Sequence, residues 1–167
     1  MQYAVVTTIQ FLFAFLVIYA IISDTMKLVI PNWISLCLFL LFCLYCAWSF
    51  PQTSIALSLL SMCIVFTVAA IFFHFGLLGG GDVKFLTVLS LWAGPDNIIG
   101  FIVLVNILGA LLALLVMKST FFSKRFPGAV ENNEILAKVA SWRQKNICPY
   151  GIAIGSAALI VAPSIFA

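Results

Sequence analysis

Charged side chains are scarce in this chain of 167 residues: Asp, Glu, Lys and Arg together make up 8% of it, while hydrophobic residues make up 65%. An ordinary soluble domain carries roughly 25% charged residues, so that class is excluded. The length holds about six membrane-spanning helices of ~20 residues each and little else. We therefore predict an all-α polytopic membrane bundle that forms a single domain over 1–167, without a separate soluble catalytic domain.

The sequence also lacks the features of a secretory signal and of a metal site. No basic side chain precedes the first apolar stretch and no Ala-x-Ala-type cleavage site follows it, which predicts a retained helix. One C-x-x-C pair, Cys43 and Cys46, has neither a second pair nor a nearby histidine. Metal or redox use stays open, but small buried hydrophobic side chains are the commoner role. We expect no metal, no cofactor and no nucleic-acid partner.

Breaker residues divide the chain into six apolar segments, expected at 4–23, 33–50, 55–78, 83–94, 98–117 and 148–167. The fourth is short, because twelve residues of helix cover ~18 Å and the hydrocarbon core is ~30 Å thick. Either this helix continues past Gly94 and Pro95, or it begins below the surface after a non-helical break at 79–82. Such a break is tolerated where it lines a wet cavity.

The distribution of positive charge predicts the orientation. Every Lys and Arg lies in one of three links, 24–32, 79–84 and 118–147, and the opposite links contain none. The positive-inside rule places these three links in the cytoplasm and the N-terminus outside. The stretch 118–147 is expected to be a cytoplasmic loop, with an interfacial helix over 131–145 that lies on the membrane surface or grips a substrate.

Two of the five acidic residues, Asp24 and Asp82, stand beside apolar stretches and on the same predicted face. A carboxylate at a membrane boundary is costly to desolvate, which indicates a function. Two carboxylates that share a proton form the acid/base pair of an aspartic protease. Taken singly, Asp24 could pair with Lys27, and Asp82 could cap the fourth helix. Taken together, beside glycines that let an extended substrate approach the backbone, they favour catalysis.

Three short motifs resemble those of the type IV prepilin peptidases. Asp24 followed by Ile30-Pro31-Asn32 looks like the first-aspartate motif, and Gly79-Gly80-Gly81-Asp82 with Lys84 matches Gly-x-Gly-Asp and its lysine. Pro149-Tyr150-Gly151 resembles the opening of the last helix in the short branch that serves Flp/Tad-type pili. The resemblance implies that Asp24 and Asp82 are catalytic.

The same resemblance implies an enzyme that cleaves the leader of a prepilin or pseudopilin at the cytoplasmic face of the bacterial inner membrane. Longer members also methylate the new N-terminus and carry a domain with paired C-x-x-C motifs. This chain shows no such pairs, so we expect neither methyltransferase activity nor zinc. The candidates for substrate binding or for shaping the site are Lys27, Pro31, Asn32, Gly79, Gly80, Gly81, Lys84, Pro149, Tyr150 and Gly151.

Other interpretations stay open at this point. An archaeal-type preflagellin peptidase shares the two aspartate motifs. A small transporter or proton channel would use Asp24 and Asp82 as relay groups, and a non-catalytic assembly subunit would use neither. Lys84 could bind an acidic residue of the substrate, tune Asp82 or anchor its helix, and His74 could line the cavity or simply be a hydrogen-bonded helix residue. The oligomeric state is not predicted.

Overall fold

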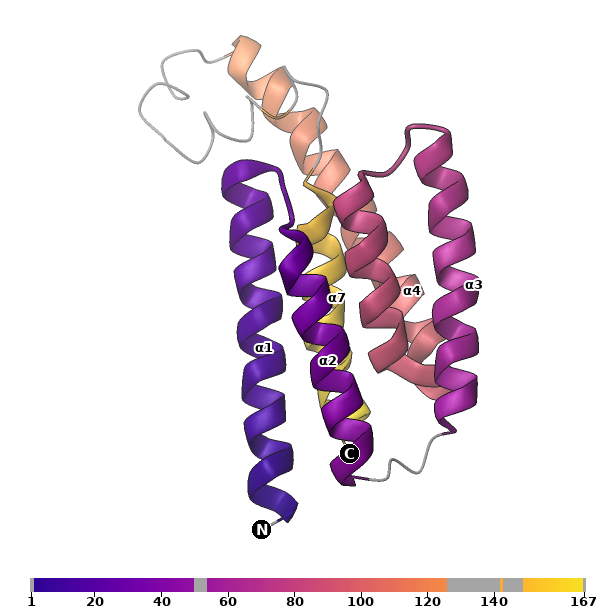
Figure 1. Ribbon diagram of the computed structural model, residues 1–167. Coiled ribbons are helices and arrows are strands. Elements are labelled where there is room, and N and C mark those ends of the chain that lie inside the picture. The colour runs from indigo at the N-terminus through magenta and orange to yellow at the C-terminus, as the bar shows by residue number, and fades with distance from the viewer. Residues whose placement is uncertain (1, 50–53, 126–141, 143–148, 167) are drawn as a thin grey trace.

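The computed structural model describes residues 2–49, 54–125, 142 and 149–166, and this part of the chain is helical without strands. Its helices are α1 (Gln2–Lys27), α2 (Asn32–Ser49), α3 (Ile55–His74), α4 (Gly80–Arg125) and α7 (Tyr150–Ile165). They lie side by side as a bundle, with the α1–α2 link and the α3–α4 link at the same end (Figure 1). The predicted all-α membrane-type bundle is confirmed.

Three helical stretches of the described chain are long and apolar enough to cross a membrane: Ala4–Lys27, Ile55–His74 and Gly80–Lys118. The apolar helices Asn32–Trp48 and Tyr150–Ile165 are shorter than the ~20 residues of a typical span. Large apolar side chains cover the outside of the bundle, where Phe11 and Ile99 are about three quarters exposed. The protein is therefore a membrane protein, but the described residues do not form the expected six separate spans.

The difference arises at Gly94, where the predicted fourth and fifth segments form one element, α4. Gly94 has φ 63° and ψ −177°, a conformation that suits glycine, and it separates an arm at 80–93 from an arm at 95–125. Figure 1 shows α4 reversing direction at the end of the bundle opposite the α3–α4 link. Pro95 opens the second arm, where its fixed φ suits a first helical turn and its missing N–H costs nothing.

Two further boundaries differ from those expected. α1 continues past 23 to Lys27, so Asp24 lies within its last turn; Leu28, with φ 55°, ends the helix and donates its N–H to the Asp24 carbonyl at 2.9 Å. α3 ends at His74 rather than at 78 because Gly76, with φ 71°, closes a Schellman motif. In that motif the N–H of Gly76 bonds the Phe73 carbonyl and the N–H of Leu77 bonds the Phe72 carbonyl.

Of the two alternatives for the fourth segment, the structure does not show the non-helical break at 79–82; the chain is non-helical at 75–79 instead. Within 79–82 only Gly79 lies outside a helix, and Gly80, Gly81 and Asp82 form the first turn of α4. At the other end, α4 continues to Arg125, so the loop expected from 118 does not begin there. The predicted interfacial helix at 131–145 lies outside the described residues except for Trp142, whose side chain is buried.

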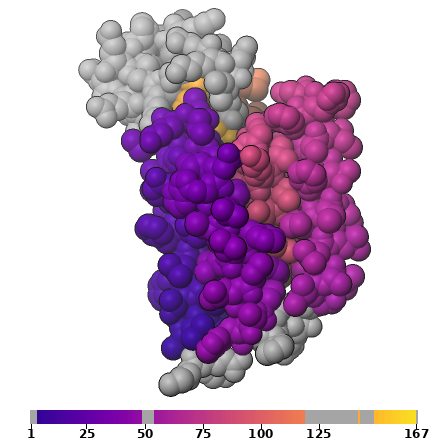
Figure 2. Space-filling view, in the orientation of Figure 1, coloured from indigo at the N-terminus to yellow at the C-terminus, as the bar shows by residue number. Residues whose placement is uncertain are grey.

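An aromatic cluster stabilises the end of the bundle away from Asp24. Trp92 contacts Phe13, Phe42, Tyr45 and Phe166, with ring centroids 4.9 to 5.6 Å apart. Its indole N–H donates to the Leu38 carbonyl at 3.1 Å. These contacts join α1, α2, α4 and the end of α7. In the space-filling view, α1 and α2 cover one side of the visible face, and α3 with α4 covers the other (Figure 2).

Candidate active site

Asp24 is buried where the last turn of α1 meets the link to α2. Asp24 is only 5% exposed, and its side-chain Oδ2 has no hydrogen-bond partner among the described residues. The neighbouring Ser23 hydroxyl donates to the Val29 carbonyl at 2.9 Å, which ties the link back onto the helix. The end of α1 and the start of the link therefore hold the backbone of Asp24 from both sides.

Asp82 is placed by the start of α4. Gly79 is the residue before the helix, and its N–H donates to Asp82 Oδ2 at 3.3 Å, while its carbonyl accepts from Val83 at 3.1 Å. A carboxylate at the third helical position that accepts from the capping residue is half of a capping box. Asp82 is thus not the N-cap residue that the sequence allowed. A Cβ on Gly79 would lie 2.9 Å from Asp82 Oδ2, so a side chain at this position would displace the carboxylate.

The two aspartates line one cavity of about 400 Å³, here called the aspartate cavity. It is formed by the α1–α2 link and the start of α4. Figure 1 shows these two segments at the same end of the bundle. The other residues that line the aspartate cavity come from these same two segments: Leu28, Val29, Ile30, Pro31, Asn32, Gly79, Gly80, Gly81 and Lys84. Two motifs whose aspartates are more than fifty residues apart in sequence thus form one site.

Two contacts join the motifs across the cavity. The Lys84 ammonium donates to Asn32 Oδ1 at 3.0 Å, which links the N-terminal part of α4 to the first residue of α2. Gly81 lies against the backbone of Ile30, since a Cβ built on Gly81 would be 3.4 Å from the Ile30 carbonyl oxygen. A larger side chain than alanine would push the link and the helix apart. The two motifs are thus joined by the hydrogen bond from Lys84 to the Asn of Ile-Pro-Asn and by the close contact of Gly81 with Ile30.

The Pro-Tyr-Gly motif packs against residues of the site without lining the aspartate cavity. Pro149 is the buried residue before α7, and Tyr150 packs against Gly109, where a Cβ would be 2.7 Å from the Tyr150 ring. Gly151 lies against Asp24, and a Cβ there would be 2.7 Å from Asp24 Oδ2. These three residues do not line the aspartate cavity, but Gly151 leaves the space that the Asp24 carboxylate occupies.

A family model for the type IV leader peptidase family matches residues 11–114, more than half of the chain, and this span includes both aspartates. The chain belongs to the type IV leader peptidase family. Comparison with curated proteins finds no match, and comparison with solved structures finds none either. Family membership identifies the protein as a leader-peptidase-type protease and suggests a protein substrate such as a prepilin.

Two candidates of this leader peptidase lie outside the aspartate cavity. Lys27 is exposed and does not line it, and His74, for which the sequence left both a cavity position and an ordinary helix position open, is the exposed last residue of α3 beside the Phe75 ring. Among the described residues no group of three His, Cys, Asp or Glu side chains could hold a metal ion. Leu28 and Val29 line the cavity although no motif marks them. The left-handed conformation of Leu28 carries no sequence signal, because glycine or asparagine is usual there.

Proposed function

We propose that the protein is an aspartic endopeptidase that removes the leader peptide of type IV, Flp-type prepilins or pseudopilins, with Asp24 and Asp82 as the catalytic pair. The observation that carries this proposal is that both carboxylates, from motifs on different helices, line one cavity of about 400 Å³. A transporter or channel needs relay groups along a path across the bundle, whereas these two groups share one end of it.

The chemistry needs a water molecule between the two carboxylates. One carboxylate takes a proton from the water while the water oxygen attacks the scissile carbonyl carbon. The other carboxyl group, which is protonated, donates its proton to the carbonyl oxygen. When the tetrahedral intermediate collapses, the C–N bond breaks and the leaving amine takes a proton from the pair. The two groups titrate as a unit, so the proton belongs to the pair rather than to either residue.

The glycines supply backbone donors rather than an extended strand. Gly80, Gly81 and Asp82 form the first turn of α4, where N–H groups have no acceptor within the helix. Gly80 and Gly81 carry no side chain that would cover these groups, and both line the aspartate cavity. In this proposal the N–H groups bind carbonyl oxygens of the leader peptide next to the scissile bond.

We further propose six membrane crossings, with the N-terminus outside and the aspartate cavity facing the cytoplasm of the bacterial inner membrane. The apolar stretch Gly80–Lys118 has 39 residues. As one straight helix it would measure about 58 Å, roughly twice the hydrocarbon core, so its two arms at 80–93 and 95–118 would each cross once. α2 and α7 would supply the remaining crossings beside α1 and α3.

The test is cleavage of a Flp-type prepilin by the purified protein, with the cut site read by mass spectrometry. Asp24→Asn and Asp82→Asn should each abolish leader removal while the protein still accumulates in the membrane. Asp96→Asn is the matched control, because Asp96 is exposed beside the Gly94 break and does not line the aspartate cavity. Complete leader removal by either of the first two variants would contradict the proposal.

A further inference from the structure

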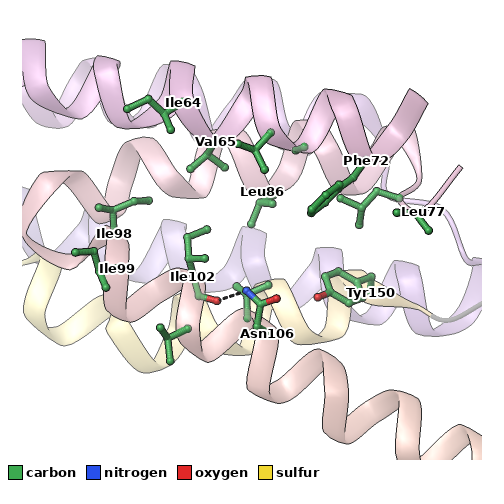
Figure 3. A pocket seen from close by; sticks show the side chains of 15 residues that line it. Ile64, Val65, Phe72, Leu77, Leu86, Ile98, Ile99, Ile102, Asn106 and Tyr150 are labelled. Atoms are coloured by element: carbon green, nitrogen blue, oxygen red, sulfur yellow. Dashed lines mark hydrogen bonds between the residues drawn. The ribbon is translucent and has the colours of Figure 1, made fainter. Parts of the chain in front are cut away.

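A second and larger hollow opens on the side of the bundle beside α3. This apolar groove has a volume of about 570 Å³ and lies between α3, the two arms of α4 and the start of α7 (Figure 3). Its walls are side chains such as Ile64 and Val68 on α3 and Ile99 and Val103 on α4. Among the described residues that line the groove, Asn106 is the one with an amide side chain, and Figure 3 shows it beside the Tyr150 ring.

The apolar groove leads to the aspartate cavity along three separate segments of the chain. Leu77 and Leu78 line the groove, and the residue that follows them, Gly79, lines the cavity. On α4, Asp82 lines the cavity and Leu86, one turn later, lines the groove. On α7, Tyr150 lines the groove while the next residue contacts Asp24. A chain that leaves the aspartate cavity along these segments would thus enter the apolar groove.

The shape of the groove suits one flank of a helix. Its wall on α3 spans Ile64 to Phe72 and its wall on α4 spans Ile98 to Asn106, so that the last residue of each wall lies eight positions after the first. At a rise of 1.5 Å per residue, each wall is about 12 Å long, a little more than two turns of a docked helix. Helices in a bilayer associate through close packing and interhelical hydrogen bonds, and a groove offers more of both than a flat helix face.

We propose that the apolar groove binds the membrane-spanning helix of the substrate, the segment that directly follows the scissile bond. This inference rests on the proposed function, because it assumes that the peptide is cut in the aspartate cavity. A lipid chain also fits apolar walls, and the Asn106 amide does not distinguish the two occupants, because its N–H donates to the Ile102 carbonyl at 2.8 Å. The substrate helix is favoured because it has a fixed connection to the bond that is cut.

The decisive assay compares two substrates. One is a full-length prepilin in detergent or vesicles, and the other is a soluble peptide that spans the leader junction and stops before the apolar helix. Val68→Trp and Val103→Trp fill the groove from opposite walls, where both side chains are about half exposed. Each should lower kcat/KM for the full-length substrate relative to the peptide by about tenfold or more, as expected for loss of a packed anchor.

Ile18→Trp on α1 is the matched control, since Ile18 has similar exposure and lies outside the groove. It should leave the ratio between the two substrates unchanged. An unchanged ratio in both groove variants, or an equal loss on both substrates, would overturn the inference while leaving the proposed function intact. Failure of the unmodified protein to cut the full-length prepilin would instead refute the proposed function.

Photo-crosslinking provides a second readout that does not depend on cleavage. A photoreactive residue at Ile99, which is 76% exposed in the groove wall, should form an adduct with the prepilin helix in the non-cleaving Asp24→Asn background. The same group placed at Ile18 should not. Adducts at Ile99 only with lipid, with a second copy of the protein or with residues 126–148 of the same chain would overturn the inference.

Discussion

Replacing Gly151 by alanine should displace the Asp24 carboxylate while changing the stability of the bundle only moderately. The added Cβ would lie 2.7 Å from both Asp24 Oδ2 and Ile30 Cδ1, and 3.0 Å from Asp24 Cγ. An ordinary contact of this kind is 3.4 Å or longer, so the carboxylate must move by about 0.7 Å. Because Oδ2 ends a short side chain while the backbone of Asp24 is held on both sides, the carboxylate should move rather than the helix.

The expected costs differ in size for stability and for catalysis. Extra volume in a packed site costs about 1–3 kcal/mol, and replacing glycine by alanine inside a helix returns about 1 kcal/mol. The net loss of stability is therefore about 2 kcal/mol at most. For catalysis, a displacement of about 1 Å in a reacting group can cost about 100-fold. We expect kcat for prepilin cleavage to fall by about 10- to 100-fold, while the melting temperature falls by at most about 4–8 °C.

Gly155→Ala is the control for this prediction. Gly155 lies one turn further along α7, and its Cβ would be 2.6 Å from Ile21 Cγ1 on the same face of α1. The packing cost is comparable, but no carboxylate is displaced, so kcat should stay close to that of the unmodified protein. Melting temperature in detergent and initial rates of leader cleavage measure the two effects. A Gly151→Ala variant with normal kcat, or equal losses of kcat in both variants, would refute the assignment of Gly151 as a positioning residue.

Three further changes test other parts of the structure. Lys84→Met and Asn32→Leu remove the same 3.0 Å hydrogen bond, so the double variant should lose no more unfolding free energy than the worse single variant; additive losses would show that the bond does not join the motifs. Leu28→Gly should be more stable than Leu28→Ala by about 1 kcal/mol, because φ 55° suits glycine; equal melting temperatures would show that this backbone conformation is not held. Trp92→Phe removes the hydrogen bond to the Leu38 carbonyl and should lower the melting temperature by about 2–4 °C for a loss of about 1 kcal/mol. An unchanged melting temperature would show that the indole N–H does not stabilise the core.

The meeting of the two aspartate motifs could be predicted because it depends on topology alone. Two apolar helices, α2 and α3, separate the end of α1 from the start of α4, so the two motifs return to the same end of the bundle. Charge in the links then marks that end. The apolar character of the helices was equally plain from composition. These features depend on sequence order and hydropathy, which a single chain displays directly.

The local structure at the glycines could not be predicted in the same way. Three successive glycines disfavour a helix interior by about 1 kcal/mol each, which favoured a non-helical break. At a helix start the free N–H groups are exposed in any case, and Asp82 accepts from Gly79, so the first turn forms there. Leu28 is a similar case, because tertiary contacts hold a bulky residue at positive φ where sequence statistics favour glycine.

The contact between Gly151 and Asp24 gives the last helix a role that the family match does not contain. The matched span ends at residue 114, whereas α7 begins at Tyr150. Gly151 and Gly155 face α1 one turn apart, which lets α7 approach α1 closely enough to enclose the Asp24 carboxylate. Asp82, in contrast, is positioned by Gly79 within its own motif. Asp82 is therefore positioned by residues of its own motif, whereas the position of Asp24 depends on α7, a helix more than 120 residues away in sequence.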